Sequence, residues 1–209
     1  MLRFIVVMSI GIGVLFAIYF LTLPPEVSAT SSPTPPAAVP QNSTAVSASS
    51  ASPAQPVSIF ATRFKDHLLI MGGDGFPHAF DNAKLAGVKY WAFYYSASWC
   101  PPCRAFTPEL VNFYNQFKPS HPNFELIFVN EDNSDGDMID YMKNDAMPWP
   151  AIWYQDIRNP QLSASKYAGP GIPCLVLVDA NGNVLSDSFR NGQYVGAQTV
   201  MNDIPNLVQ

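Results

Sequence analysis

The sequence predicts an α/β domain with one central mixed β-sheet flanked by helices. Apolar, strand-like runs alternate with helix-like segments from about residue 57 to the end of the 209-residue chain. Their order is strand, helix, strand, helix, hairpin, helix, and this order is typical of helices packed against one sheet. We therefore expect an N-terminal segment at 1–23, a linker at 24–56 and the folded domain at 57–209.

The N-terminal segment is long and apolar enough to cross a membrane. Residues 4–23 are twenty residues without a charge, and as a helix they span about 30 Å, the thickness of a bilayer's hydrocarbon core. Arg3 precedes them and no further Lys or Arg occurs before Arg63. By the positive-inside rule we expect an uncleaved signal anchor and an extracytoplasmic domain, periplasmic in a bacterium. The alternative is a signal peptide cleaved near Ala29, which would leave a secreted protein.

The linker is rich in Pro, Ser, Thr and Ala, and Glu26 is its only charged residue. Such a composition buries too little apolar surface to offset the cost of ordering the chain, so we expect a disordered tether.

The formal net charge of the whole chain is −5 and no basic stripe occurs. We therefore expect no nucleic-acid partner.

The predicted elements of the domain follow from hydrophobic periodicity and turn signals. We expect strands at 68–71, 90–95 and 124–130, and a hairpin of 174–179 with 184–189 around Asn181-Gly182. Helices are expected at 101–117, 137–144 and 195–206, with a short helix or strand at 58–67. The helix at 101–117 carries a core-facing apolar stripe of Phe106, Leu110, Phe113 and Phe117.

The chemistry is indicated by the run Trp99-Cys100-Pro101-Pro102-Cys103-Arg104, which joins a predicted strand to a predicted helix. A Cys-x-x-Cys pair at a helix start is typical of thiol–disulfide exchange, because the helix N-terminus lowers the pKa of the first thiol. We expect Cys100 to be the N-cap and the nucleophile. Cys103, one turn along, then resolves the mixed disulfide.

Two prolines between the cysteines favour a reductant. Proline has no N–H, so Pro101 and Pro102 remove two donors that would otherwise stabilise the Cys100 thiolate. Stabilising the reduced thiolate makes a motif more oxidising, so weaker stabilisation favours donation of electrons.

A metal site is the competing interpretation of the pair. Structural zinc takes four ligands, and beyond the pair the chain has only Cys174 and three isolated histidines, His67, His78 and His121. We expect no metal and no cofactor. A copper(I) chaperone that uses Cys100 and Cys103 remains a lesser alternative, because soft thiolates suit copper(I).

A family resemblance adds to these inferences. The segment from Tyr94 to Arg104 reads YYSASWCPPCR and is followed by Phe106-Thr107-Pro108. With Met147-Pro148-Trp149 and Gly171-Ile172-Pro173, it resembles the tryparedoxin and nucleoredoxin branch of the thioredoxin superfamily. The resemblance covers roughly residues 57–205.

The resemblance implies a thioredoxin fold with a redox disulfide between Cys100 and Cys103. It also implies a cis peptide at Ile172–Pro173 that presents the backbone of Ile172 to an extended substrate. The substrate-binding residues that we expect are Trp99, Pro101, Trp149, Ile172 and Pro173. For Trp149, simple core packing is an equal alternative.

Two positions are left open. Tyr94 stands where typical thioredoxins have a buried aspartate, so the proton acceptor for Cys103 is water or another group, with Glu131 and Asp132 as candidates. Cys174 directly follows the expected cis-proline. It is either a small buried strand residue or a third thiol that modulates the reactive pair.

The sequence therefore predicts a membrane-tethered, extracytoplasmic protein-disulfide reductase. Its partners would be protein thiol and disulfide substrates and a thiol electron donor such as a membrane-embedded thiol carrier. The alternative within the same chemistry is an oxidase or isomerase of secreted proteins.

Overall fold

The computed structural model describes residues 58–209. The predicted anchor at 1–23 and the predicted linker at 24–56 lie outside the described residues. Within the described part of the chain, no helix is both long and apolar enough to cross a membrane.

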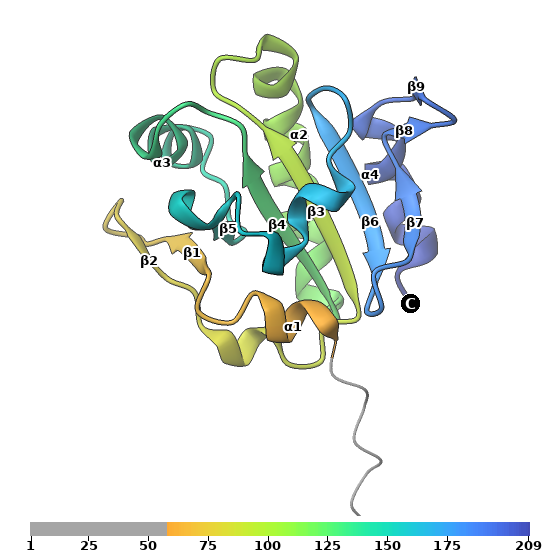
Figure 1. Cartoon of the computed structure of the whole chain (residues 1–209), viewed down its shortest axis with the longest axis horizontal. Coiled ribbons are helices and arrows are strands. Elements are labelled where there is room, and N and C mark those ends of the chain that lie inside the picture. Colours follow the sequence, from red (N-terminus) through yellow and green to blue (C-terminus); the bar gives the residue numbers. More distant parts are fainter. Residues whose placement is uncertain (1–57) are drawn as a thin grey trace, which may run out of the picture. The chain divides into compact units, whose positions relative to one another are not determined.

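The domain is built on a seven-stranded mixed sheet with the strand order β2-β1-β5-β4-β3-β6-β7 (Figure 1). The strands are β1 (Leu68–Met71), β2 (Pro77–Ala79), β3 (Tyr90–Ser96), β4 (Phe124–Asn130), β5 (Ala151–Ile152), β6 (Cys174–Asp179) and β7 (Val184–Asp187). Strand β3 pairs in parallel with β4 and antiparallel with β6. A separate two-stranded hairpin, β8 (Phe189–Arg190) with β9 (Gln193–Tyr194), follows β7.

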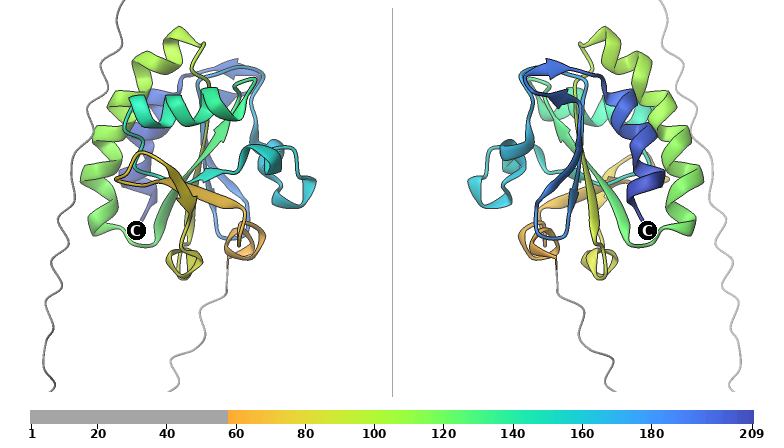
Figure 2. Two further views of the ribbon diagram at one scale, coloured as in Figure 1. Left: turned by 90° about the vertical axis from the view of Figure 1, so that its left-hand side faces the viewer. Right: turned by 90° about the vertical axis from the view of Figure 1, so that its right-hand side faces the viewer.

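Helices cover both faces of this sheet. They are α1 (Ile59–Arg63), α2 (Pro101–Phe117), α3 (Asp135–Asn144) and α4 (Ala197–Leu207). Buried residues of α2, α3 and α4 form one core cluster with one face of the sheet. Residues of α1 and of the 3-10 turns between β5 and β6 pack against the other face, and Figure 2 shows the two layers with the sheet edge-on.

Strand β3 lies in the interior of the sheet, between β4 and β6, and its side chains are apolar on both faces. Ala92 and Tyr94 point into the α2–α4 core, while Trp91, Phe93 and Tyr95 point into the opposite core. A strand whose residues are nearly all buried needs a partner on each edge and cover on each face. The strand therefore ends, at Ser96, in the middle of one rim of the sheet, and the reactive pair follows directly.

The predicted boundaries of α2, β1, β4 and β6 are confirmed residue for residue. The strand predicted at 90–95 ends one residue later, at Ser96, and the element expected at 58–67 is the five-residue helix α1. Three further predictions also differ in detail. Helix α3 begins two residues earlier, because the Ser134 side chain caps it by accepting from Asp137 N, and α4 begins at Ala197 after the positive-φ Gly196. The run at 184–189 is divided between β7 and β8, so the chain turns away from the sheet one residue before Phe189.

Candidate active site

The reactive pair lies where β3 passes into α2. Cys100 is the N-cap of α2 and has no side-chain cap bond, and Pro101 and Pro102 occupy the first turn. A disulfide joins Cys100 to Cys103, with 5.2 Å between their Cα atoms. Cys103 is completely buried, whereas Cys100 keeps 4% of its surface exposed. An incoming group can therefore reach Cys100 and not Cys103.

Few backbone donors are available at this helix start. Pro101 and Pro102 have no N–H, and the N–H of Arg104 is engaged by the carbonyl oxygen of Cys100 at 3.1 Å. The N–H of Cys103 is left as the donor of the first turn that can face the Cys100 sulfur. The helix dipole therefore acts on Cys100 with little direct hydrogen bonding.

The second wall of the site is the loop before β6. The Ile172–Pro173 peptide is cis, as the resemblance implied. The carbonyl oxygen of Ile172 lies 3.8 Å from Cys100 Sγ, and the Ile172 side chain packs against a small cluster of Ala97, Cys100 and Cys103. The loop thus places backbone polar groups beside the attacking sulfur, where an extended substrate can pair with them.

The β8–β9 hairpin packs against this loop and holds it in place. Tyr194 donates its hydroxyl to the carbonyl oxygen of Pro173 at 2.8 Å. A Cβ at Gly169 would overlap the ring of Phe189, so the loop can only pack this closely on the hairpin with glycine there. The hairpin therefore fixes the position of the loop that carries Ile172 and Pro173.

Trp99 is the exposed apolar residue next to the reactive sulfur. Its side chain is 58% exposed, and its indole N–H donates to the carbonyl oxygen of Glu131 at 3.3 Å. Trp99, Ile172, Tyr95 and Glu131 line a groove of about 220 Å³ together with residues 168–171. Trp99 thus lies on the wall of a groove, and its contact with a substrate stays a prediction. Pro101 is also exposed.

The placement of Trp149 in the substrate groove is wrong. Trp149 is fully buried and its ring packs edge-on against Tyr94 and Tyr114 in the α2–α4 core. The residue follows the turn after α3 and precedes β5, so its side chain points into the core that those elements cover. Of the two alternatives, core packing is the correct one.

A buried hydroxyl network lies beneath Cys103, and sequence reasoning missed it. Thr107 donates to the carbonyl oxygen of Cys103 at 2.9 Å, and its Oγ1 also lies 2.8 Å from the Tyr94 hydroxyl and 2.6 Å from the Tyr141 hydroxyl. Tyr141 is in turn 2.9 Å from Ser96 Oγ. The network ties the first turn of α2 to β3 and α3. The threonine four residues after the second cysteine was the available sequence signal.

The two carboxylates proposed as proton acceptors have different surroundings. Asp132 is buried, and its Oδ1 accepts from the N–H and the hydroxyl of Ser98, both at 2.8 Å. It therefore fixes the loop before Trp99. Glu131 is more open, and its partial burial raises its pKa while Arg158 opposes that shift. Transfer of the Cys103 proton to either group stays a prediction.

Cys174, the third thiol, is fully buried at the start of β6 and is directly opposite Tyr95 on β3. Burial raises the pKa of the Cys174 thiol to about 11. A thiol in such surroundings is almost wholly protonated at neutral pH and reacts slowly. The structure therefore favours the interpretation of Cys174 as a packed strand residue.

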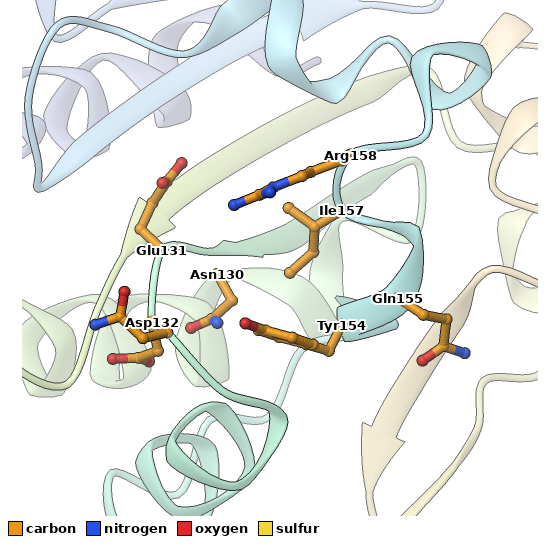
Figure 3. Close-up of a pocket in the computed structure, with 8 residues that line it drawn as sticks. Asn130, Glu131, Asp132, Tyr154, Gln155, Ile157 and Arg158 are labelled. Atoms are coloured by element: carbon orange, nitrogen blue, oxygen red, sulfur yellow. The ribbon is translucent and has the colours of Figure 1, made fainter.

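A larger pocket adjoins the groove. Figure 3 shows it between the end of β4 and the 3-10 turn after β5. Its volume is about 540 Å³. Its lining includes Asn130, Glu131, Asp132, Tyr154 and Arg158. Glu131 belongs to both cavities. The pocket was not predicted, because its residues are far apart in the sequence.

The histidines considered as metal ligands are dispersed. His67 pairs with Asp156 at 2.9 Å and His78 pairs with Asp74 at 2.9 Å. Over residues 58–209, no group of three or more His, Cys, Asp or Glu side chains is arranged to hold a metal ion.

Comparison with known proteins agrees with this geometry. Residues 87–184 match the model of a family described as thioredoxin-like. Human nucleoredoxin is 40% identical over 110 residues, which is 53% of this chain and 25% of that protein. Probable nucleoredoxin 1 of Arabidopsis thaliana is 37% identical over 131 residues, or 60% of this chain and 22% of that protein. The chain thus spans about a quarter of the length of these relatives.

Two solved structures match over nearly their whole length. Tryparedoxin II from C. fasciculata is 32% identical with a TM-score of 0.52, covering 70% of this chain and 92% of that one. Tryparedoxin I from Leishmania major is 30% identical with a TM-score of 0.51 and the same two coverages. With its Cys100–Cys103 pair at the start of α2 and its cis-proline loop beside it, the chain belongs to the thioredoxin superfamily, as a redox protein with nucleoredoxin homologues and tryparedoxin structural neighbours.

Proposed function

We propose that this protein is a protein-disulfide reductase tethered to a membrane, with its folded domain outside the cytoplasm. The reaction rests on one observation above all. At the start of α2 the Cys100 sulfur lies 3.8 Å from the Ile172 carbonyl oxygen and keeps a small exposed surface between two residues of the groove, Trp99 and Ile172, while Cys103 is fully enclosed. This is the arrangement that thiol–disulfide exchange requires, an attacking thiol at the surface and a resolving thiol within reach.

The proposed reaction has two steps. The Cys100 thiolate attacks one sulfur of a substrate disulfide, that S–S bond breaks, and the leaving thiolate takes a proton. Cys103, deprotonated in turn, attacks Cys100 Sγ and releases the second substrate thiolate. The substrate gains two electrons and the protein is left as its own disulfide, so each turnover needs an external dithiol as reductant.

The direction of electron flow is inferred from the donors around Cys100. Pro101 and Pro102 contribute no N–H, and the side chain of Cys100, the N-cap of α2, accepts no hydrogen bond from the backbone of the helix. A thiolate with few donors is a weaker leaving group and a less stable reduced form than one with several. The reduced protein is therefore expected to donate its electrons readily to a substrate disulfide.

The decisive measurement is the equilibrium reduction potential of the Cys100–Cys103 pair in the full-length protein, titrated against glutathione or dithiothreitol. A value near −270 mV, like that of thioredoxin, supports the reductase. A value of about −120 to −180 mV would instead make the protein an oxidase or isomerase of secreted proteins and overturn the argument from the two prolines.

The proposed location rests on residues 4–23 and on the charge distribution around them. Protease protection in sealed membrane vesicles tests it. In right-side-out vesicles, added protease should remove the domain from the membrane. Protection of the domain until the vesicles are lysed would place it in the cytoplasm.

A further inference from the structure

The pocket shown in Figure 3 continues the groove in which the substrate is proposed to lie. Both cavities include Glu131, and the Trp99 indole is bonded to the carbonyl oxygen of that residue. A substrate segment that passes Trp99 and Ile172 therefore leads to the wall formed by Glu131. The side chains on the other side of that wall are next in its path.

Most polar groups of the pocket are already engaged within the protein. Asp132 accepts two hydrogen bonds from Ser98. The side-chain amide of Asn130, correctly oriented, donates to Asp132 Oδ2 at 2.6 Å and accepts from Asp132 N at 3.1 Å. These groups form a satisfied floor and have little capacity left for a ligand.

Arg158, which also lines the pocket, is not paired in this way. Within residues 58–209 it makes no ion pair shorter than 4.0 Å, whereas Lys118 pairs with Glu125 at 3.1 Å and Arg190 pairs with Asp203 at 2.6 Å. Figure 3 shows the Arg158 side chain along the rim of the pocket, with its guanidinium group directed toward Glu131.

Glu131 does not neutralise this cation fully. The two groups are not in ion-pair contact, and the longer-range effect of Arg158, which lowers the pKa of Glu131, is outweighed by the raising effect of burial. A guanidinium group has five N–H donors in a planar fork that matches a carboxylate, and it keeps its charge at any physiological pH. The pocket therefore presents one free site for an anion, beside the groove of the reactive sulfur.

We propose that Arg158 is a specificity-determining residue that binds a carboxylate side chain of the polypeptide substrate, close in sequence to the cysteine that Cys100 attacks. The inference rests on the proposed reductase function and names its substrate class as disulfides flanked by Asp or Glu. It assigns Arg158 to recognition and leaves both chemical steps to Cys100 and Cys103.

Single-turnover reduction of model disulfides tests the proposal. The substrates are symmetrical disulfide dimers of acetylated and amidated peptides, in which Glu, Gln or Lys is scanned over three positions on each side of the cysteine. The fully reduced, full-length protein is the only electron source. At the best position we expect the Glu peptide to react up to about fivefold faster than its Gln counterpart, because an exposed ion pair contributes only a modest free energy.

Variants of exposed cations provide the comparison. In Arg158→Ala the advantage of Glu over Gln should vanish while the Gln rate stays within twofold, and Arg158→Lys should keep part of the advantage. Lys166→Ala is the matched control. Lys166 is an exposed cation on the same segment between β5 and β6, so its removal changes the net charge equally but should leave the preference intact.

A binding measurement separates recognition from rate. In Cys103→Ser the mixed disulfide between Cys100 and the peptide accumulates, and its equilibrium amount should be higher for Glu than for Gln only when Arg158 is present. Equal behaviour of Glu, Gln and Lys peptides, or a preference that survives Arg158→Ala, overturns the inference and leaves the reductase proposal standing. If the wild-type protein reduces none of the peptides, the reductase proposal itself fails and the inference fails with it.

Discussion

The start of α2 and the start of β6 both carry cysteine, and the two sites have opposite chemistry. Cys100 lies at a helix N-terminus next to a groove. Cys174 lies one strand away, opposite Tyr95, and is sealed in the core. The helix end favours the thiolate, whereas burial among apolar groups favours the thiol and raises the Cys174 pKa to about 11.

The contrast predicts that the local surroundings of each cysteine, rather than its distance from the active site, determine how readily it forms a thiolate. Cys174 immediately follows Pro173, whose neighbour Ile172 contacts Cys100. This proximity does not make it a redox centre, because no helix end and no opening to solvent accompany it. Four measurements, taken here from the largest expected effect to the smallest, can break or sharpen this contrast.

The first compares the serine variants of the two sites. Cys100→Ser should abolish reduction of a protein disulfide such as those of insulin, leaving only the uncatalysed rate, because no other thiol can attack. Cys174→Ser should stay within about twofold of wild type in kcat/KM once its folding is verified by circular dichroism. A large loss in a folded Cys174→Ser protein would restore its interpretation as a modulating thiol.

The second measures alkylation of the fully reduced protein by iodoacetamide at pH 8, followed by mass spectrometry of each cysteine. With a pKa of about 11, Cys174 should react about 200-fold more slowly than an unperturbed thiol of pKa 8.5, from the thiolate fraction alone. Cys100 should react at least as fast as that reference. Comparable rates at Cys100 and Cys174 in the native protein would contradict the contrast.

The third tests the hydrogen bonds that hold the start of α2, the helix end on which the Cys100 side of the contrast depends. Thr107→Val should lower the free energy of unfolding by about 2 kcal/mol, because the Tyr94 and Tyr141 hydroxyls lose a buried partner. Thr199→Val is the matched control. Thr199 also donates to a carbonyl four residues earlier, that of Val195, but at an exposed position, so its loss should cost less than about 0.5 kcal/mol. Urea denaturation of the oxidised proteins gives both values.

The fourth follows from the raised pKa of Cys174. The folded protein keeps that proton up to about pH 11, whereas an unfolded cysteine loses it near pH 8.5. The unfolded state then binds fewer protons, so stability falls as the pH rises between these values. In the oxidised protein this decline should be shallower for Cys174→Ala than for wild type, by up to about 1.4 kcal/mol per pH unit. Identical slopes would show that Cys174 does not carry the shift.

Sequence reasoning reached the elements whose signals are local. The long apolar run of β4 and the Cys-Pro-Pro-Cys start of α2 define their own ends, and the structure confirms them. The two-residue β5 has no periodicity to detect, since its pairing with β1 and β4 depends on the rest of the sheet. Short edge elements of this kind are specified by tertiary contacts rather than by local propensity.

The residues of the candidate site also fall into two groups, those marked by local motifs and those that only the fold brings together. The pair, its exposed tryptophan and the loop at Ile172–Pro173 are marked by contiguous motifs. The Thr107–Tyr94–Tyr141 network and the Arg158 pocket join residues from distant elements, and only the fold brings them together. Trp149 was misplaced for this reason, because an aromatic residue in a family motif gives no signal of which way it points.

The position of β3 between β4 and β6 has a consequence for the order in which the protein becomes competent. During synthesis the chain emerges from its N-terminus, so the cysteine pair is made long before the antiparallel partner of β3 exists. Strand β6, the Ile172–Pro173 loop and the β8–β9 hairpin are all translated after the cysteine pair. A nascent chain thus carries its cysteine pair before it carries the Ile172–Pro173 loop, which lies beside Cys100 in the folded domain.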